Sequence, residues 1–237
     1  MDGMSHQPLT PGSVAAILPA AGRSSRFKNA GEKKVFAMLA GRPVWQHAVL
    51  ALRRRPEIGL IVIAIANEDR PQWESHAALL REWGVTLCDG GAERMDSVRS
   101  ALALVGDARL VAIHDAARPL VPDADIASVI AVANQTGAAC LAAPVRGTLK
   151  RDLGAEGGSQ TVDRRAIFEA LTPQVFQTPI LRAAYERWQG RAVTDDAQLV
   201  ERAGYRVRIV PGSAINLKIT QPEDLELAAA LMAKQVG

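Results

Sequence analysis

Residues 60–66 read LIVIAIA, a run in which every side chain is aliphatic. A strand that is exposed on one face alternates apolar and polar residues, whereas a strand of a parallel sheet is buried on both faces and reads as a continuous apolar run. Similar short runs occur at residues 14–20, 109–114 and 138–145, and stretches with helical periodicity, such as residues 43–54, separate them. This alternation predicts an α/β fold with a Rossmann-like, mostly parallel sheet flanked by helices.

The alternation stops at about residues 146–162, a polar stretch with Gly154, Gly157 and Gly158 between two short strand-like pieces. We expect a β-hairpin arm that projects from the sheet, with a mobile surface loop as the alternative. The rest of the chain predicts a single domain over residues 14–235 behind a flexible N-terminus at residues 1–13. Further helices are expected at residues 71–83, 93–105, 122–135, 164–170, 179–188, 195–203 and 221–234, and further strands at 85–88, 205–211 and 215–219.

Composition excludes several classes of protein. The chain has 237 residues, 48% apolar and 22% charged, which is ordinary for a globular domain. A net charge of +3 lacks the basic surplus of a nucleic-acid-binding protein, and no apolar run approaches the roughly 20 residues that span a bilayer. With no visible secretory signal, Cys88 and Cys140 are interpreted as buried thiols of a cytoplasmic protein that binds neither nucleic acid nor membrane.

The charge is distributed unevenly along the chain. Residues 14–60 carry nine Lys or Arg and two acidic residues, a net charge of +7, which leaves −4 for the remainder. The loop at residues 22–34 is therefore a candidate contact for a polyanion. The alternative is a solvated face with a basic helix end at residues 53–55.

The first strand is followed by a loop of small residues, LPAAGRSSR at residues 18–26. Such a loop lets backbone N–H groups approach phosphate oxygens closely. The dinucleotide fingerprint G-x-G-x-x-G is excluded because only Gly22 is present, and a Walker loop is excluded because position 27 is Phe. A basic surface loop is the alternative to a ligand loop. The nearby cations are Arg26, Lys28, Lys33 and Lys34.

Two later segments end at the same predicted edge of the sheet. HDAARP at residues 114–119 places Asp115 where it could hold Mg²⁺ directly or through water, and a helix cap or a partner for Arg118 is the alternative. DGGAERMDSV at residues 89–98 predicts a tight turn with exposed backbone groups, or else a simple capped helix start. Late in the chain, Lys218 lies among apolar neighbours and requires an anion. The four histidines do not have the spacing of a zinc site, and the sequence contains neither a Cys-x-x-Cys motif nor the G-x-S-x-G nucleophile turn of a serine hydrolase.

Taken together, these segments resemble the 2-C-methyl-D-erythritol 4-phosphate cytidylyltransferase family of the non-mevalonate isoprenoid pathway. The resemblance runs from about residue 14 to residue 232 and rests on the order and spacing of the motifs. It is strongest in HDAARP and in APVRGTLKR at residues 143–151, which is followed by TVDR at residues 161–164.

The resemblance also implies roles for individual residues. The CTP triphosphate would be held by Ala20, Ala21, Gly22, Arg26 and one lysine of the pair at positions 33 and 34. Spacing from Phe36, Leu39 and Gly41 favours Lys34, whereas counting from Gly22 favours Lys33. Cytosine and ribose would contact Gly90, Gly91 and Ser97. The acceptor phosphate would be bound near Asp115 and Lys218, with Thr172, Thr194 and, across a homodimer interface formed by the arm, Thr148 and Arg164.

The implied reaction is transfer of CMP from CTP to 2-C-methyl-D-erythritol 4-phosphate with release of pyrophosphate and with Mg²⁺ or another divalent cation as cofactor. Arg26 and Lys34 would act on the triphosphate and Lys218 on the pentacoordinate α-phosphoryl group. Two alternatives stay open. One is a cytidylyltransferase for another polyol phosphate, such as ribitol 5-phosphate, and the other is a nucleotide-binding module without turnover.

Overall fold

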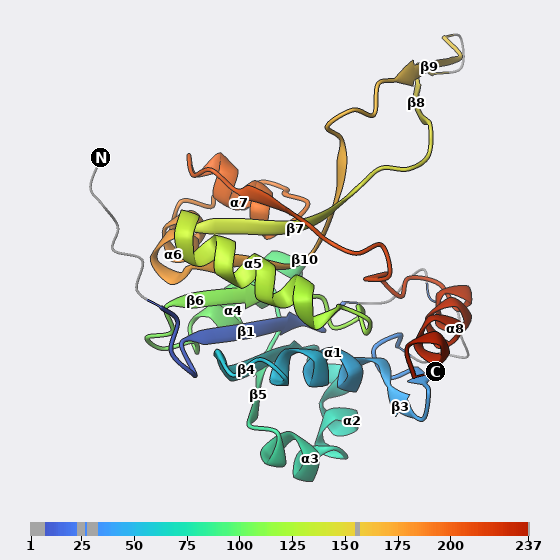
Figure 1. Cartoon of the computed structure of the whole chain (residues 1–237). Coiled ribbons are helices and arrows are strands. Elements are labelled where there is room, and N and C mark those ends of the chain that lie inside the picture. The colour runs from blue at the N-terminus through green and yellow to red at the C-terminus, as the bar shows by residue number, and fades with distance from the viewer. Residues whose placement is uncertain (1–7, 23–26, 28–32, 155–156, 237) are drawn as a thin grey trace.

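The computed structural model describes residues 8–22, 27, 33–154 and 157–236. Its centre is a seven-stranded sheet in the order β11-β7-β10-β6-β1-β4-β5, in which only β10 runs antiparallel to its neighbours (Figure 1). The sheet strands are β1 (Val14–Pro19), β4 (Ile58–Ile65), β5 (Val85–Asp89), β6 (Leu110–Ile113), β7 (Ala138–Pro144), β10 (Phe168–Gln177) and β11 (Arg208–Pro211). The predicted mostly parallel α/β sheet is therefore confirmed.

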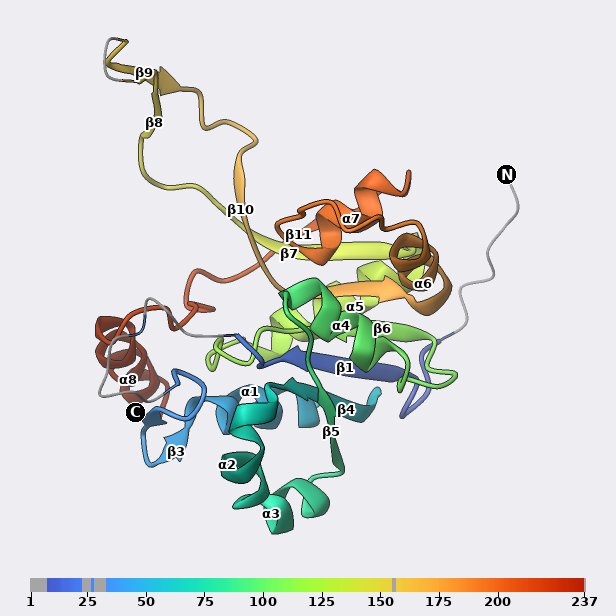
Figure 2. The ribbon, with the colours of Figure 1, turned by 180° about the vertical axis from the view of Figure 1, so that it is seen from behind.

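Helices cover both faces of this sheet (Figures 1 and 2). Successive β1 side chains point to opposite faces, so Ala16 and Leu18 pack with α1 and α5, whereas Ala15 and Ile17 pack with α4, α6 and α7. All four of these β1 residues are fully buried, as a strand in the centre of a doubly covered sheet must be. The helices are α1 (Val44–Arg53), α2 (Arg70–Glu74), α3 (Ala77–Glu82), α4 (Arg94–Leu102), α5 (Asp123–Thr136), α6 (Thr178–Glu186), α7 (Asp196–Arg202) and α8 (Glu223–Val236).

A smaller apolar cluster lies beyond the carboxyl edge of the sheet. It joins α8 to the two-stranded unit of β2 (Met38–Leu39) and β3 (Arg42–Pro43) through Leu39, Ile219 and Ala228. Phe27, only 5% exposed, is part of it. The side chain at position 27 is thus buried in apolar packing.

The predicted arm is a hairpin. β8 (Leu149–Asp152) pairs antiparallel with β9 (Ser159–Val162), and the pair stands clear of the main sheet (Figures 1 and 2). Three large apolar side chains on or beside the arm are exposed, namely Leu153, Ile167 and Phe168. An isolated hairpin with exposed apolar groups requires a packing partner.

Three predicted elements were wrong. Residues 164–170 are not a helix, because Phe168 begins the long strand β10, whose backbone bonds are made to β7 and β6. Residues 215–219 are not a strand but a connection that crosses the sheet edge, where the Ile219 N–H donates to the Ala117 carbonyl at 2.8 Å. The helix expected at 71–83 is split into α2 and α3, and the break lets Trp73 pack against Trp45 with ring centroids 4.9 Å apart.

The N-terminal segment falls partly outside the described residues. Of the expected flexible residues 1–13, residues 8–13 are described, and the Gly12 N–H donates to the Pro56 carbonyl at 3.0 Å. Of the two expected buried thiols, Cys140 is buried but Cys88 is only half-buried. No helix among the described residues is long and apolar enough to cross a membrane.

Candidate active site

A pocket of about 680 Å³ lies at the carboxyl edge of the sheet, a typical size for a small-molecule site. The loops after β1, β4, β5 and β6 line it, because neighbouring parallel strands end at the same edge. The connection between β11 and α8 adds Lys218 to the lining. Segments that are far apart in the sequence thus meet in one cavity.

The turn after β5 forms one wall of the pocket. The Gly90 N–H donates to the Ile65 carbonyl at 2.7 Å, and the Gly91 N–H donates to the Ser97 hydroxyl at 3.1 Å. Ser97 in turn donates to the Glu93 carbonyl at 3.2 Å, so its hydroxyl organises the turn. A Cβ on Gly90 would lie 2.5 Å from the Ala21 Cβ, which means that only glycine lets this turn pack against the first loop.

The first loop forms the adjoining wall with Ala20, Ala21 and Gly22, and Lys34 lines the same cavity. Lys33 does not line it, because its Nζ contacts Asp69 Oδ2 at 2.7 Å and Glu68 Oε1 at 3.2 Å. The structure therefore favours Lys34 over Lys33 as the lysine that faces a ligand. Arg26 lies outside the described residues.

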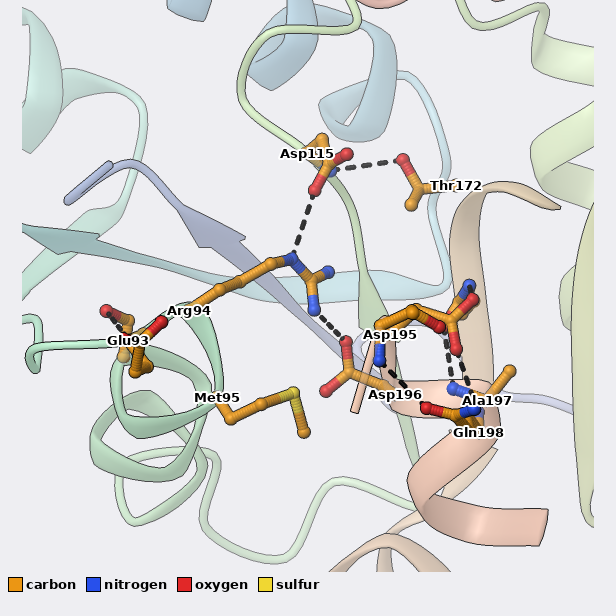
Figure 3. Close-up of polar contacts among 12 residues, drawn as sticks. Glu93, Arg94, Met95, Asp115, Thr172, Asp195, Asp196, Ala197 and Gln198 are labelled. Carbon is orange, nitrogen blue, oxygen red and sulfur yellow. Dashed lines mark hydrogen bonds and ion pairs between the residues drawn. The ribbon is translucent and has the colours of Figure 1, made fainter. Parts of the chain in front are cut away.

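Asp115 occupies the floor of the pocket among three cations. Its Oδ2 is 2.6 Å from Lys218 Nζ and 3.7 Å from Arg118 Nε. Its Oδ1 accepts from Arg94 Nε at 3.4 Å (Figure 3). Burial alone would raise the pKa of Asp115, but Arg94 and Lys218 outweigh it and hold that pKa well below its usual range. The carboxylate is therefore ionised throughout the physiological range.

A second set of bonds fixes the backbone and orientation of Asp115. Its N–H donates to the Thr172 hydroxyl at 3.1 Å, and that hydroxyl lies 3.0 Å from His114 Nδ1. His114 Nε2 lies 3.0 Å from the Arg118 carbonyl, which can only accept, so the proton is on Nε2 and the Thr172 hydroxyl donates to Nδ1. Burial lowers the pKa of His114 to about 4, which keeps the ring neutral. His114 is therefore a packing residue that holds the site.

The donor set around Asp115 does not fit a directly bound divalent cation. Both carboxylate oxygens already contact cationic side chains, so a further cation there would meet like charges. Among the described residues, no group of three or more His, Cys, Asp or Glu side chains gathers in a way that could hold a metal ion.

The structure brings most of the predicted site residues into one pocket. Those that line it are Ala20, Ala21, Gly22, Lys34, Gly90, Gly91, Ser97, Asp115 and Lys218. Thr172 is buried behind Asp115 and touches it through its hydroxyl. Thr194 is exposed beside α7, and Thr148 and Arg164 are exposed on the arm; none of these three lines the described pocket. Arg164 donates to the Arg146 carbonyl within the arm itself.

Several residues that complete the site are not among those predicted to bind the substrates. Arg94 contacts both Asp115 and the fully buried Asp196 (Figure 3). Arg118 donates to the Asn216 carbonyl at 2.7 Å, which holds the crossing segment that carries Lys218. The sequence signals for them are the spacing of Arg118 from Asp115 and the position of Arg94 one turn before Ser97, whereas nothing local points to Asp196.

Comparisons with known proteins identify the family of the chain. Residues 14–234 match the model of the 2-C-methyl-D-erythritol 4-phosphate cytidylyltransferase family. The enzyme of that name from Rhodopirellula baltica is 49% identical over 233 residues, covering 93% of this chain and 95% of its own length. The one from Aeromonas hydrophila is 42% identical over 229 residues and covers 96% of this chain and 92% of its own.

Solved structures agree as well. The crystal structure of 2-C-methyl-D-erythritol 4-phosphate cytidylyltransferase from Thermus thermophilus superposes with a TM-score of 0.76 at 33% identity, covering 92% of this chain and 98% of that one. The 4-diphosphocytidyl-2C-methyl-D-erythritol synthase of Anaerococcus prevotii gives 0.80 at 26% identity, covering 93% and 98%. Motif order, pocket and relatives lead to one assignment: the chain belongs to the 2-C-methyl-D-erythritol 4-phosphate cytidylyltransferase family.

Proposed function

We propose that this chain transfers CMP from CTP to 2-C-methyl-D-erythritol 4-phosphate and releases pyrophosphate. The observation that carries the proposal is the pocket itself, in which a small-residue loop, a double-glycine turn and a cluster of cations share one cavity. The cluster joins Arg94, Arg118 and Lys218 to the carboxylates of Asp115 and Asp196, and Lys34 lines the same cavity. Cationic side chains at a pocket suit two substrates that are both anionic phosphates.

The chemistry requires positioning and charge stabilisation rather than a protein nucleophile. An oxygen of the acceptor phosphate attacks the α-phosphorus of CTP, a new P–O bond forms, and the bond to the pyrophosphate leaving group breaks in line. Lys34 and Arg26 would hold the triphosphate, and Lys218 would offset the charge on the pentacoordinate α-phosphoryl group. Asp115, whose Oδ2 lies 2.6 Å from Lys218 Nζ, would hold that lysine in place for this role.

A requirement for Mg²⁺ or another divalent cation is part of this proposal. Because Asp115 is already surrounded by Arg94, Arg118 and Lys218, the triphosphate oxygens rather than the protein would be the principal ligands of such a cation. Asp115 could then reach it only through water.

We also propose that the arm makes the protein a homodimer and that Thr148 and Arg164 bind the acceptor in the partner's pocket. Both residues are exposed on the arm, away from the pocket of their own chain. The exposed Leu153, Ile167 and Phe168 would be covered by the second copy. A cytoplasmic location belongs to the proposal too, supported by the two cysteines being free thiols.

The test is pyrophosphate release from CTP in the presence of Mg²⁺ and one acceptor at a time. We expect release with 2-C-methyl-D-erythritol 4-phosphate. Release only with another polyol phosphate, such as ribitol 5-phosphate, would move the assignment to that acceptor. CTP binding without release with any acceptor would instead identify a nucleotide-binding module.

A further inference from the structure

Asp196 is a carboxylate for which the proposed chemistry has no use. It is the first residue of α7 and has no exposed surface. A buried carboxylate is costly unless donors surround it, and Asp196 has two: the Tyr185 hydroxyl at 2.6 Å from Oδ1 and Arg94 Nη1 at 2.5 Å from Oδ2. Both oxygens of the Asp196 carboxylate accept a hydrogen bond, and one of the two donors, Arg94, lines the pocket. Asp196 is therefore placed to hold a pocket side chain in position.

What Asp196 holds is the guanidinium of Arg94. That group lies between two carboxylates, with Nη1 on Asp196 and Nε on Asp115 (Figure 3). A guanidinium donates in fixed directions, so fixing one edge of it fixes the direction of the other. Arg94 also begins α4, directly after the turn that carries Gly91. The Arg94 side chain therefore links the turn after β5, which is assigned to CTP, to Asp115 on the pocket floor.

The other end of this link is rigid. Asp195 caps α7 by accepting the Gln198 N–H at 2.8 Å. The Gln174 side chain from β10 donates to Asp195 at 2.9 Å and accepts the Ala197 N–H at the same distance. The first turn of α7 is thus bonded to a central strand of the sheet, and the Asp196 side chain is carried by that rigid turn.

Tyr185, on α6, completes the arrangement. Its hydroxyl is buried, and burial together with the neighbouring Asp196 raises its pKa, so it stays a donor at all working pH values. The Tyr185 oxygen also lies 3.8 Å from Met95 Sδ. Removing this hydroxyl would free one carboxylate oxygen of Asp196 and allow the Arg94 guanidinium to turn.

We infer that Asp196, held by Tyr185, is a positioning residue that fixes the Arg94 guanidinium and, through it, the carboxylate of Asp115 on the acceptor side of the pocket. The inference rests on the proposed function for its kinetic consequence. Loss of the Tyr185 hydroxyl raises KM for the polyol phosphate and leaves KM for CTP unchanged, because the loop and turn assigned to CTP keep their own bonds. A merely structural role would lower the melting temperature without separating the two KM values.

The experiment compares Tyr185→Phe, which removes only the hydroxyl, with Tyr205→Phe at the only other tyrosine. The Arg187 Cζ atom lies 5.9 Å from the centroid of the Tyr205 ring. Tyr205 has no part in the contacts among Tyr185, Asp196 and Arg94. A hydrogen bond to a charged group predicts a rise of about tenfold in KM for the acceptor in Tyr185→Phe and less than about twofold for CTP. Arg94→Lys keeps the charge but cannot span two carboxylates, so its rise should be larger. Equal rises for both substrates, or none, would overturn the inference.

A second readout does not depend on turnover. The Arg94 Nε–H signal, assigned by its loss in Arg94→Lys, should have a high NMR order parameter in the wild type and in Tyr205→Phe and a clearly lower one in Tyr185→Phe. An unchanged order parameter overturns the inference whatever the activity. Wild-type protein that releases no pyrophosphate with any acceptor would overturn the proposed function, and the Arg94 signal would still decide the role of Tyr185 and Asp196.

Discussion

Alanine substitution at two adjacent lysines tests how the pocket holds the triphosphate. Lys34 lines the pocket, whereas Lys33 Nζ contacts Asp69 at 2.7 Å and Glu68 at 3.2 Å. We therefore expect Lys34→Ala to lose turnover while keeping its fold. We expect Lys33→Ala to keep most of its turnover and lose stability.

A generic charge pair sets the size of the first effect, and the burial of Asp69 sets the size of the second. A charge pair at about 4 Å and an effective dielectric constant near 20 contributes about 4 kcal/mol, which corresponds to a loss of roughly 1,000-fold in kcat/KM for Lys34→Ala. Lys33→Ala leaves Asp69, only 7% exposed, without its cation, at a cost of about 1–3 kcal/mol of unfolding free energy. For a chain of this size that lowers Tm by roughly 2–12 °C.

The assay is steady-state pyrophosphate release at varied CTP and saturating acceptor, with thermal unfolding of the same samples. The two variants serve as each other's control because they remove the same side chain one residue apart. Wild-type-like kcat/KM in Lys34→Ala would refute the assignment. A hundredfold loss in Lys33→Ala with unchanged Tm would instead identify Lys33 as the phosphate-binding lysine.

Three further predictions concern other parts of the molecule. Burial lowers the pKa of His114 from 6.5 to about 4, so between these pH values the unfolded chain binds more protons than the folded chain. Urea unfolding should therefore give a free energy of unfolding about 2 kcal/mol lower at about pH 5 than at about pH 7.5. His114→Gln should lack this difference. Gly90→Ala, whose Cβ would lie 2.5 Å from that of Ala21, should raise KM for CTP without lowering kcat to a similar extent, and an unchanged KM would contradict the close packing of this turn. If Arg164 acts in the partner's pocket, co-expressed Arg164→Ala and Lys218→Ala chains should regain about a quarter of wild-type activity, because half of the dimers are mixed and each of these has one intact site. Monomers in sedimentation, or no recovery of activity, would contradict the dimer.

The central sheet could be predicted from the sequence because burial on both faces leaves a signal in each strand. Val62 and Ile63 point to opposite faces of β4 and both are fully buried, so neither position tolerates a polar residue. β10 carries no such signal at its start, where Phe168 is partly exposed. Its strand conformation is set by pairing with β7 and β6, which lie far away in the chain. Local propensity contains no information about such partners.

The same distinction explains the site. The sequence placed Asp115 at the end of a buried strand, and a lone carboxylate at such an edge is a reasonable metal ligand. Two cations that contact the Asp115 carboxylate change what it can bind. Arg94 lies 21 residues earlier in the chain, and Lys218 lies in the crossing segment before α8. Arg94 is in turn held by Asp196, 102 residues later in the chain. Because each of these charges decides what the next one can bind, the role of Asp115 follows from the assembled cluster and not from its own motif.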